Sequence, residues 1–274
     1  VLYGVFAETS ITQLLIAGVF PGLLTAAVYA LMIIGRCKLN PKLAPPTTIT
    51  VDRGERWRAL GAVWPLLVLI LGIIGGLYGG IVTPTEAGAF GAFLAFVIAF
   101  FQKRLSLKVI KDSVLEAVTS TARIFFVAVG AVMLTKFLAL TGVPVYLGQL
   151  IGDWALDPLL LVIGASLIYL VLGMFLDPLG ILLITLPVLL PMFEALDLDL
   201  IWFGVLVVKY LEIGLLTPPV GFNVYVIKSV VGDTVDLETI FRGVTWFLGC
   251  EVIIVALLIA YPQISLFLPN TMSN

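Results

Sequence analysis

Two short stretches of this sequence place oxygen-bearing and helix-breaking residues inside apolar runs. The first is GMFLDPLG, residues 173–180, which begins at Gly173 and holds Asp177 before a proline. The second is LLTPPVGFN, residues 215–223, which contains Leu216, Thr217, Pro218, Pro219, Gly221 and Asn223. A proline has no N–H to donate to the carbonyl four residues back, so the carbonyls near Gly214 and Leu215 are expected to lose their helical partners.

Freed carbonyls and a carboxylate are costly within a membrane. Asp177 at bilayer depth would cost about 2.5–3.5 kcal/mol, so it needs a partner or a cation. Non-helical backbone is tolerated there only where it is buried in protein or lines a cavity, and broken transporter helices hold Na⁺ and anionic substrates in this way. The two stretches supply the paired breaks that such a site requires. A proline kink that only shapes packing is the alternative for the second stretch.

The composition of the chain dictates the elements that carry these stretches. Of the 274 residues, 61% are hydrophobic and 12% charged, and the mean hydropathy is +1.17. These values predict an all-α, polytopic membrane protein with about eight spanning or half-spanning segments. The net charge of −2 is too small to indicate a nucleic-acid partner. The sequence contains no histidine, which removes the commonest metal ligand. No cluster with catalytic logic is present, so an enzyme is disfavoured.

The apolar blocks and the charges between them predict which loops face the cytoplasm. A segment rich in lysine, arginine and proline, residues 36–58, is expected to be a cytoplasmic linker by the positive-inside rule. Ser106–Val118 has charged and apolar residues at helical spacing, and we expect it to follow the cytoplasmic surface before the chain re-enters near Arg123. The blocks are Ile11–Gly35, Ala59–Gly80, Pro84–Phe101, Ile124–Leu140, Pro158–Phe175, Ile181–Phe193, Ile201–Leu216, Phe222–Val231 and Gly243–Tyr261.

Acidic residues flank the run that contains the first stretch, and neither flank holds a basic residue. Flanks of the same character favour entry and exit on one face, as a re-entrant hairpin over about 158–193 with its tip at 173–180. Two full crossings joined by a tight turn are the alternative. The acidic residues are Asp153 and Asp157 before the run and Glu194, Asp197 and Asp199 after it.

A third interruption, YGGIVTPTEAGAFGAF, has a good structural explanation. Thr83 precedes Pro84, and Glu86 follows three residues after the threonine, which is the pattern of a capping box at a helix start. Helix initiation is therefore favoured over ion binding for Thr83 and Glu86, which remain secondary candidates for a site.

Four further charged residues interrupt apolar segments. Lys209 and Glu212 are three residues apart and are expected to pair on one helix face. Glu212 also lies one turn before the second break, so it stays a candidate ligand. Lys136 and Glu251 lie near segment ends, where snorkelling explains them as well as a functional role does.

Three motifs occur in order along the chain: YGGIVTPTEAGAFGAF, LGMFLDPLGILLITLPVLLP and EIGLLTPPVGFN. Together they resemble the large membrane subunit of tripartite ATP-independent periplasmic (TRAP) transporters, and the resemblance covers the whole chain. It implies two inverted repeats, each with a re-entrant hairpin and a discontinuous helix that move as a unit against a scaffold, in elevator fashion. It also implies a multi-pass protein of a bacterial or archaeal cytoplasmic membrane that is not an enzyme.

The resemblance assigns parts of the chain to this architecture. Residues 1–35 correspond to the end of the first repeat, with half of a broken helix and the following transmembrane helix, and residues 59–274 to the second repeat. In the second repeat, the broken helix covers about 201–231 and the last transmembrane helix about 243–262. The first hairpin and first break are missing, so the chain is expected to be a fragment that does not transport alone.

The resemblance further implies a cargo and partners. Na⁺ is the expected coupling ion, and no other cofactor is expected. Its expected ligands are the backbone carbonyls around Gly173 and from Leu216 to Gly221, the Thr217 hydroxyl and the Asp177 carboxylate. The substrate is expected to be a small carboxylate such as a C4-dicarboxylate or sialic acid. The implied partners are membrane lipid, a small membrane subunit and a periplasmic substrate-binding protein. A stand-alone Na⁺/dicarboxylate symporter without a binding protein is the alternative.

Overall fold

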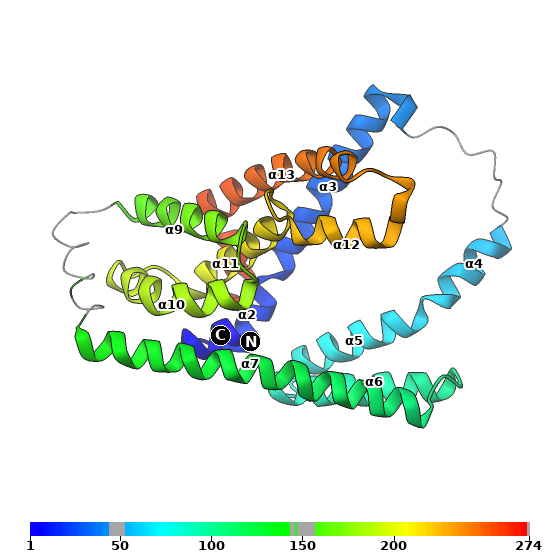
Figure 1. Ribbon diagram of the computed structural model, residues 1–274, viewed down its shortest axis with the longest axis horizontal. Coiled ribbons are helices and arrows are strands. Elements are labelled where there is room, and N and C mark those ends of the chain that lie inside the picture. The colour runs from blue at the N-terminus through cyan, green and yellow to red at the C-terminus, as the bar shows by residue number, and fades with distance from the viewer. Residues whose placement is uncertain (44–52, 143–145, 147–156, 273–274) are drawn as a thin grey trace. The chain divides into compact units, whose positions relative to one another are not determined.

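The computed structural model describes residues 1–43, 53–142, 146 and 157–272 (Figure 1). Every regular element in these ranges is a helix. Five helical segments are long and apolar enough to cross a membrane: Ile11–Leu39, Pro84–Phe101, Leu107–Leu134, Pro178–Ala195 and Leu237–Ala260. The predicted all-α, polytopic membrane class is therefore confirmed. Asp153, one of the acidic flanking residues, lies outside the described ranges.

The chain divides into two compact units, one formed by residues 37–123 and the other by residues 1–36 together with 124–274. The smaller unit contains η1 (Pro41–Leu43), α4 (Arg53–Ala62), α5 (Trp64–Tyr78) and α6 (Pro84–Phe101). Its helices α5 and α6 pack closely, because a side chain at Gly72 or Gly91 would meet Leu94 or Ile73 within 2.8 Å. Small residues thus allow this contact, as they commonly do between membrane helices.

Helix α7 connects the two units and corrects one prediction. It runs from Leu107 to Thr141 as a single helix of 35 residues. Residues 107–118 of the expected surface segment and the apolar block Ile124–Leu140 are therefore parts of one helix, so the predicted change from a surface segment to a re-entering one near Arg123 does not occur between two helices. The reason is local, because residues 107–123 contain neither glycine nor proline to end the helix.

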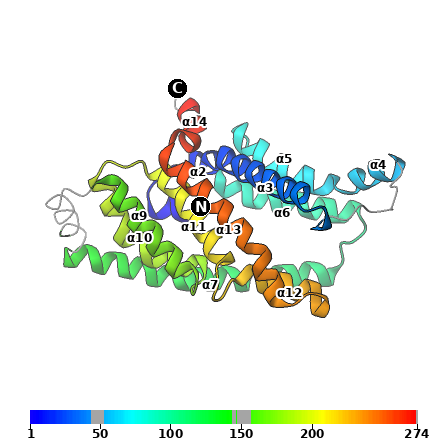
Figure 2. The same ribbon diagram turned by 90° about the horizontal axis from the view of Figure 1, so that it is seen from above.

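The larger unit is built around α11 (Leu200–Leu216), of whose 17 residues 11 are buried. Helix α11 packs most extensively against α9 and also contacts α2, α10, α12, α13 and α14 (Figures 1 and 2). Phe203 of α11 stacks on Phe193 of α10 with ring centroids 3.7 Å apart. The other elements are α1 (Leu2–Phe6), α2 (Ile11–Ala17), α3 (Val19–Leu39), α9 (Pro158–Gly173), α10 (Pro178–Ala195), α12 (Phe222–Val231), η2 (Gly232–Thr234), α13 (Leu237–Ala260) and α14 (Gln263–Met272).

Aspartates fix where the three central helices begin. The side chain of Asp157 accepts from the Leu159 N–H at 2.9 Å and caps α9. Asp177 and Asp199 cap α10 and α11 in the same manner. A proline at the first helical position of α9 and of α10 adds its preset φ to the cap. Acidic residues that the sequence presents as flanking charges therefore also start helices.

Helices α9 and α11 run parallel and in register. Tyr169 stacks on Tyr210 with ring centroids 6.0 Å apart and an interplanar angle of 26°. Four residues further along each helix, Gly173 lies against Gly214, and a Cβ on Gly214 would come within 2.6 Å of the Gly173 Cα. Both pairs join residues 41 positions apart, which is possible only for helices that run in the same direction. The sequences YLVLG and YLEIG thus lie side by side.

We expect Gly214→Ala to destabilise the protein by about 1–3 kcal/mol, as overpacking against backbone does. The new methyl group would lie 2.9 Å from both the carbonyl carbon and oxygen of Gly173, so α9 and α11 would have to separate. Gly164→Ala on the exposed part of α9 is the matched control, since nothing lies within 4 Å of its Cβ position. Thermal unfolding of the purified full-length protein should show a loss for Gly214→Ala alone, and equal melting temperatures would contradict the close contact.

Candidate functional site

The two interrupted stretches meet at one cavity. The turn between α9 and α10 and the break between α11 and α12 line a space of about 360 Å³. Four of the residues singled out from the sequence line it: Gly173, Asp177, Gly221 and Asn223. Leu216, Thr217, Pro218 and Pro219 lie in the break beside it but do not line it. The structure thus brings together residues that are up to 50 positions apart in the chain.

The two carbonyls that were expected to lose their helical partners differ in the structure. The Thr217 N–H donates to the Gly214 carbonyl at 3.2 Å and replaces the N–H that Pro218 lacks. A tightened last turn, with the donor three residues on, satisfies that group. The Thr217 hydroxyl donates to the Ile213 carbonyl at 2.7 Å and keeps its lone pairs. The Leu215 carbonyl has no hydrogen-bond donor in the part of the chain that the structure describes, and Leu215 lines the cavity.

Gly221 turns the chain from the break into α12. Its φ of 58° and ψ of 58° are left-handed, a conformation that suits glycine. A Cβ at this position would also lie 2.8 Å from Cε1 of Phe241. No side chain caps α12, and Phe222 and Asn223 of its first turn line the cavity. The positive end of this helix therefore borders the cavity.

Asp177 has both a structural role and a free oxygen. Its Oδ2 accepts from the Gly180 N–H at 2.9 Å and caps α10. Its other oxygen has no hydrogen-bond donor among the described residues, and the side chain is exposed at the cavity. Capping uses one carboxylate oxygen, so the second is available to a cation.

The secondary candidates of the smaller unit are explained by helix initiation. The Glu86 carboxylate accepts from the Thr83 N–H at 2.8 Å, and the Glu86 N–H donates to the Thr83 hydroxyl at 3.4 Å. This is the predicted capping box at the start of α6.

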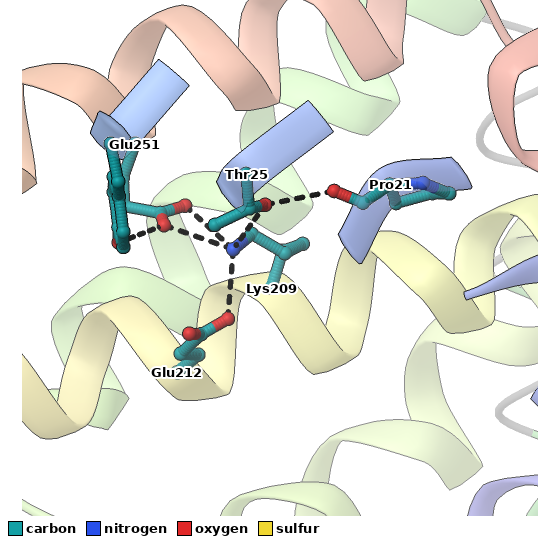
Figure 3. Close-up of polar contacts among 6 residues, drawn as sticks. Pro21, Thr25, Lys209, Glu212 and Glu251 are labelled. Atoms are coloured by element: carbon teal, nitrogen blue, oxygen red, sulfur yellow. Dashed lines mark hydrogen bonds and ion pairs between the residues drawn. The ribbon is translucent and has the colours of Figure 1, made fainter. Parts of the chain in front are cut away.

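Glu212 lies at the exposed end of an ionic network whose Lys209 and Glu251 are buried, and which the sequence revealed only in part (Figure 3). The Lys209 ammonium lies 2.8 Å from Glu212, as predicted, and 2.9 Å from Glu251 of α13. Thr25 of α3 lies 3.4 Å from the same ammonium, and the hydroxyl of Tyr29 donates to Glu251. Sequence reasoning missed Thr25 and Tyr29, since nothing local marks them as partners of α11.

The snorkelling explanation of Glu251 is wrong. Its side chain has no exposed surface, and it faces Lys209 rather than a membrane boundary. Helix α13 begins at Leu237, six residues before the predicted start of the last transmembrane helix, and Glu251 lies well inside it, nine residues before its end at Ala260. Lys136 on α7 is exposed.

Comparisons with known proteins agree on one family. Residues 1–264 match the family described as the DctM component of tripartite ATP-independent periplasmic transporters. The C4-dicarboxylate TRAP transporter large permease protein DctM of Pseudomonas aeruginosa is 32% identical over 98% of the chain and 62% of its own length. The sialic acid TRAP transporter large permease protein SiaM of Vibrio cholerae is 34% identical over the same shares, 98% and 62%. A putative TRAP transporter large permease protein of Haemophilus influenzae is 34% identical over 100% of the chain and 67% of its own length.

These relatives are transporter permeases rather than enzymes. The chain spans about 62% of the length of the first two. The matched region includes both interrupted stretches and the whole ionic network.

Proposed function

This chain belongs to the DctM family of TRAP transporter large permease proteins, and from that premise we propose that it forms part of a Na⁺-driven importer of small carboxylates in the bacterial cytoplasmic membrane. The observation that carries the proposal is the cavity where the turn between α9 and α10 meets the break in α11–α12. A small membrane subunit and a periplasmic binding protein are the proposed partners, and the substrate class follows the relatives named for C4-dicarboxylates and sialic acid.

The groups around the cavity suit a hard cation and an anion together. The free oxygen of Asp177 in the turn and the Leu215 carbonyl at the break offer hard ligands to Na⁺ at the same cavity. The Thr217 hydroxyl oxygen and the carbonyls near Gly173 and Gly221 lie in the same two breaks. The first turn of α12 and the Asn223 side chain offer donors and a positive helix end to a substrate carboxylate.

The parallel register of α9 and α11 supports the re-entrant hairpin. Helix α9 has 16 residues and would be about 24 Å long, which is short of a hydrocarbon layer of about 30 Å. The turn after α9 lies at the level of the break, because Gly173 contacts Gly214. Since α12 adds ten further, mostly apolar residues beyond the break, the hairpin tip is proposed to stop within the membrane.

The division into two units supports an elevator motion. Both arms of the hairpin and both halves of the broken helix belong to the larger unit, which holds the buried hydrophobic cluster around α11. We propose that this unit moves as one body during transport, with residues 37–123 as part of the scaffold.

We expect the full-length permease, reconstituted with its small subunit and binding protein, to take up a radiolabelled carboxylate only under an inward Na⁺ gradient. Asp177→Asn should raise the Na⁺ concentration for half-maximal uptake by about ten- to a hundredfold, as the loss of a charged ligand worth 1.5–3 kcal/mol predicts. Asp157→Asn is the matched control, because Asp157 caps α9 with similar geometry but does not line the cavity.

Equal Na⁺ curves for both variants would remove Asp177 from the ion site. Na⁺-independent uptake would overturn the proposed coupling. Full uptake after omission of the binding protein would favour the stand-alone symporter instead.

A further inference from the structure

We propose that Tyr169 and Tyr210 are positioning residues whose hydroxyl groups hold the hairpin tip and the helix break at one level. This inference deepens the proposed function and rests on it, since the positioned groups are those of the proposed ion site. Both tyrosines lie four residues before the Gly173–Gly214 contact, and their side chains are 0% and 1% exposed.

Two successive hydrogen bonds through the Ser166 hydroxyl, here called the first hydroxyl relay, join α11 to α9. The Ser166 hydroxyl lies 2.7 Å from the Val162 carbonyl and 2.5 Å from the Tyr210 hydroxyl. One serine proton serves one acceptor at a time, and the carbonyl can only accept. Ser166 therefore donates to Val162, and Tyr210 donates to Ser166.

The second relay joins the two arms of the hairpin. The Thr185 hydroxyl lies 2.8 Å from the Ile181 carbonyl and 2.7 Å from the Tyr169 hydroxyl. By the same reasoning, Thr185 donates to Ile181 and Tyr169 donates to Thr185. Because the two tyrosine rings stack, the relays link α10, α9 and α11 in one chain of contacts.

These relays add directional contacts to a register that the Gly173–Gly214 contact also favours. Leucine, isoleucine and valine dominate the rest of the interface among these helices, and contacts of this kind are non-directional. A slip of one helix along another would leave buried hydroxyl groups without partners, which is costly in an apolar interior. The hydroxyls thus reinforce the register in which both breaks open into the same cavity.

The width of that cavity depends on this register. The hairpin contributes residues 173–178 and the broken helix residues 215 and 220–223 to its walls. Both segments begin within about one turn of a tyrosine relay. Loosening the relays should therefore change the distance between the two walls before it changes the fold of either helix.

The experiment measures that distance directly. In the full-length protein with Cys37→Ser and Cys250→Ala, spin labels on Phe175→Cys and Val220→Cys report the separation of the two cavity walls by pulsed electron paramagnetic resonance. We expect one narrow distance distribution for the parent and a broadened or shifted one for Tyr210→Phe and Tyr169→Phe. Tyr261→Phe, at an exposed tyrosine, is the matched control and should leave the distribution unchanged.

The Na⁺ dependence of uptake and the melting temperature separate a positioning role from simple stabilisation. Positioning predicts a Na⁺ half-saturation raised at least severalfold in Tyr210→Phe, with uptake at saturating Na⁺ largely kept. A stabilising role alone predicts a lower melting temperature with an unchanged distance distribution and unchanged Na⁺ half-saturation, and that result would overturn the proposal. If the distances broaden in a protein that shows no Na⁺-dependent uptake even in the parent, the proposed function fails while the positioning role stands.

Discussion

Replacing Pro218 and Pro219 together by alanine is expected to abolish transport while making the interrupted segment more helical. An alanine at 219 regains an N–H that can donate to the Leu215 carbonyl, which has no donor among the described residues. Alanine is also favoured over proline in a helix interior by about 3 kcal/mol per residue. Function and local stability should therefore change in opposite directions at this break.

Two measurements on the purified full-length variant test this expectation. Amide hydrogen exchange over residues 213–222 should become slower, and Na⁺-driven uptake normalised to inserted protein should be lost. Pro191→Ala is the matched control, because Pro191 lies inside the continuous helix α10 and does not line the cavity. Slower exchange with a normal Na⁺ response would contradict the ion-site role of the break.

Thr217→Val distinguishes the ion site from a simple kink. The substitution keeps the shape of the side chain and deletes the hydroxyl that donates to the Ile213 carbonyl. An ion-site role predicts a raised Na⁺ requirement before any loss of substrate affinity. A kink that only shapes packing predicts altered assembly or thermal stability, with the Na⁺ activation curve unshifted in both this variant and the double alanine variant.

The sequence predicted helix boundaries best where capping residues or glycines mark the start or the end of a helix. Helix α12 has the predicted bounds Phe222–Val231, because Gly221 precedes it in a left-handed conformation and Gly232 ends it. Helix α6 begins at Pro84 as predicted, since Thr83 and Glu86 form a capping box. Such signals lie within a few residues of the boundary they set, so a single sequence contains them.

Local sequence patterns did not predict contacts between distant segments. Lys209 and Glu251 are 42 residues apart, and helical periodicity does not say which neighbour a buried face will meet. The charge of Glu251 within the apolar block Gly243–Tyr261 was the available signal, since the residue lies near the centre of that block, but the sequence does not say which side chain meets it. The register of α9 on α11 was visible only as the repeated spacing of YLVLG and YLEIG.

The partner of Gly214 shows a third limit of sequence reasoning. A proline pair predicts lost N–H donors correctly, but the last turn can tighten so that a nearer N–H takes their place. Here Thr217 satisfies Gly214, whereas Leu215, the other carbonyl expected to lose its partner, has no donor among the described residues. The number of missing donors follows from the sequence, whereas the carbonyl left without one depends on the final backbone geometry.

Lys209→Met is expected to destabilise the protein by about 3–5 kcal/mol, because it leaves the Glu251 carboxylate buried without a counter-charge. Glu251 has no exposed surface and would retain only the hydrogen bond from Tyr29. Glu212→Gln is the control, since the Glu212 side chain is 45% exposed and a partly exposed pair contributes about 1 kcal/mol or less.

The double variant Lys209→Met with Glu251→Gln should recover most of that loss. It removes both charges of the buried pair, and the glutamine oxygen can still accept from Tyr29. Replacing a buried ion pair by neutral groups is often close to neutral, whereas removing one partner is not. The free energies of unfolding of the parent, Lys209→Met, Glu251→Gln and the double variant form a double-mutant cycle, which measures the coupling between Lys209 and Glu251 directly. A single Lys209→Met variant as stable as Glu212→Gln would mean that water or a further cation reaches Glu251, and that α11 is not held to α13 by this pair.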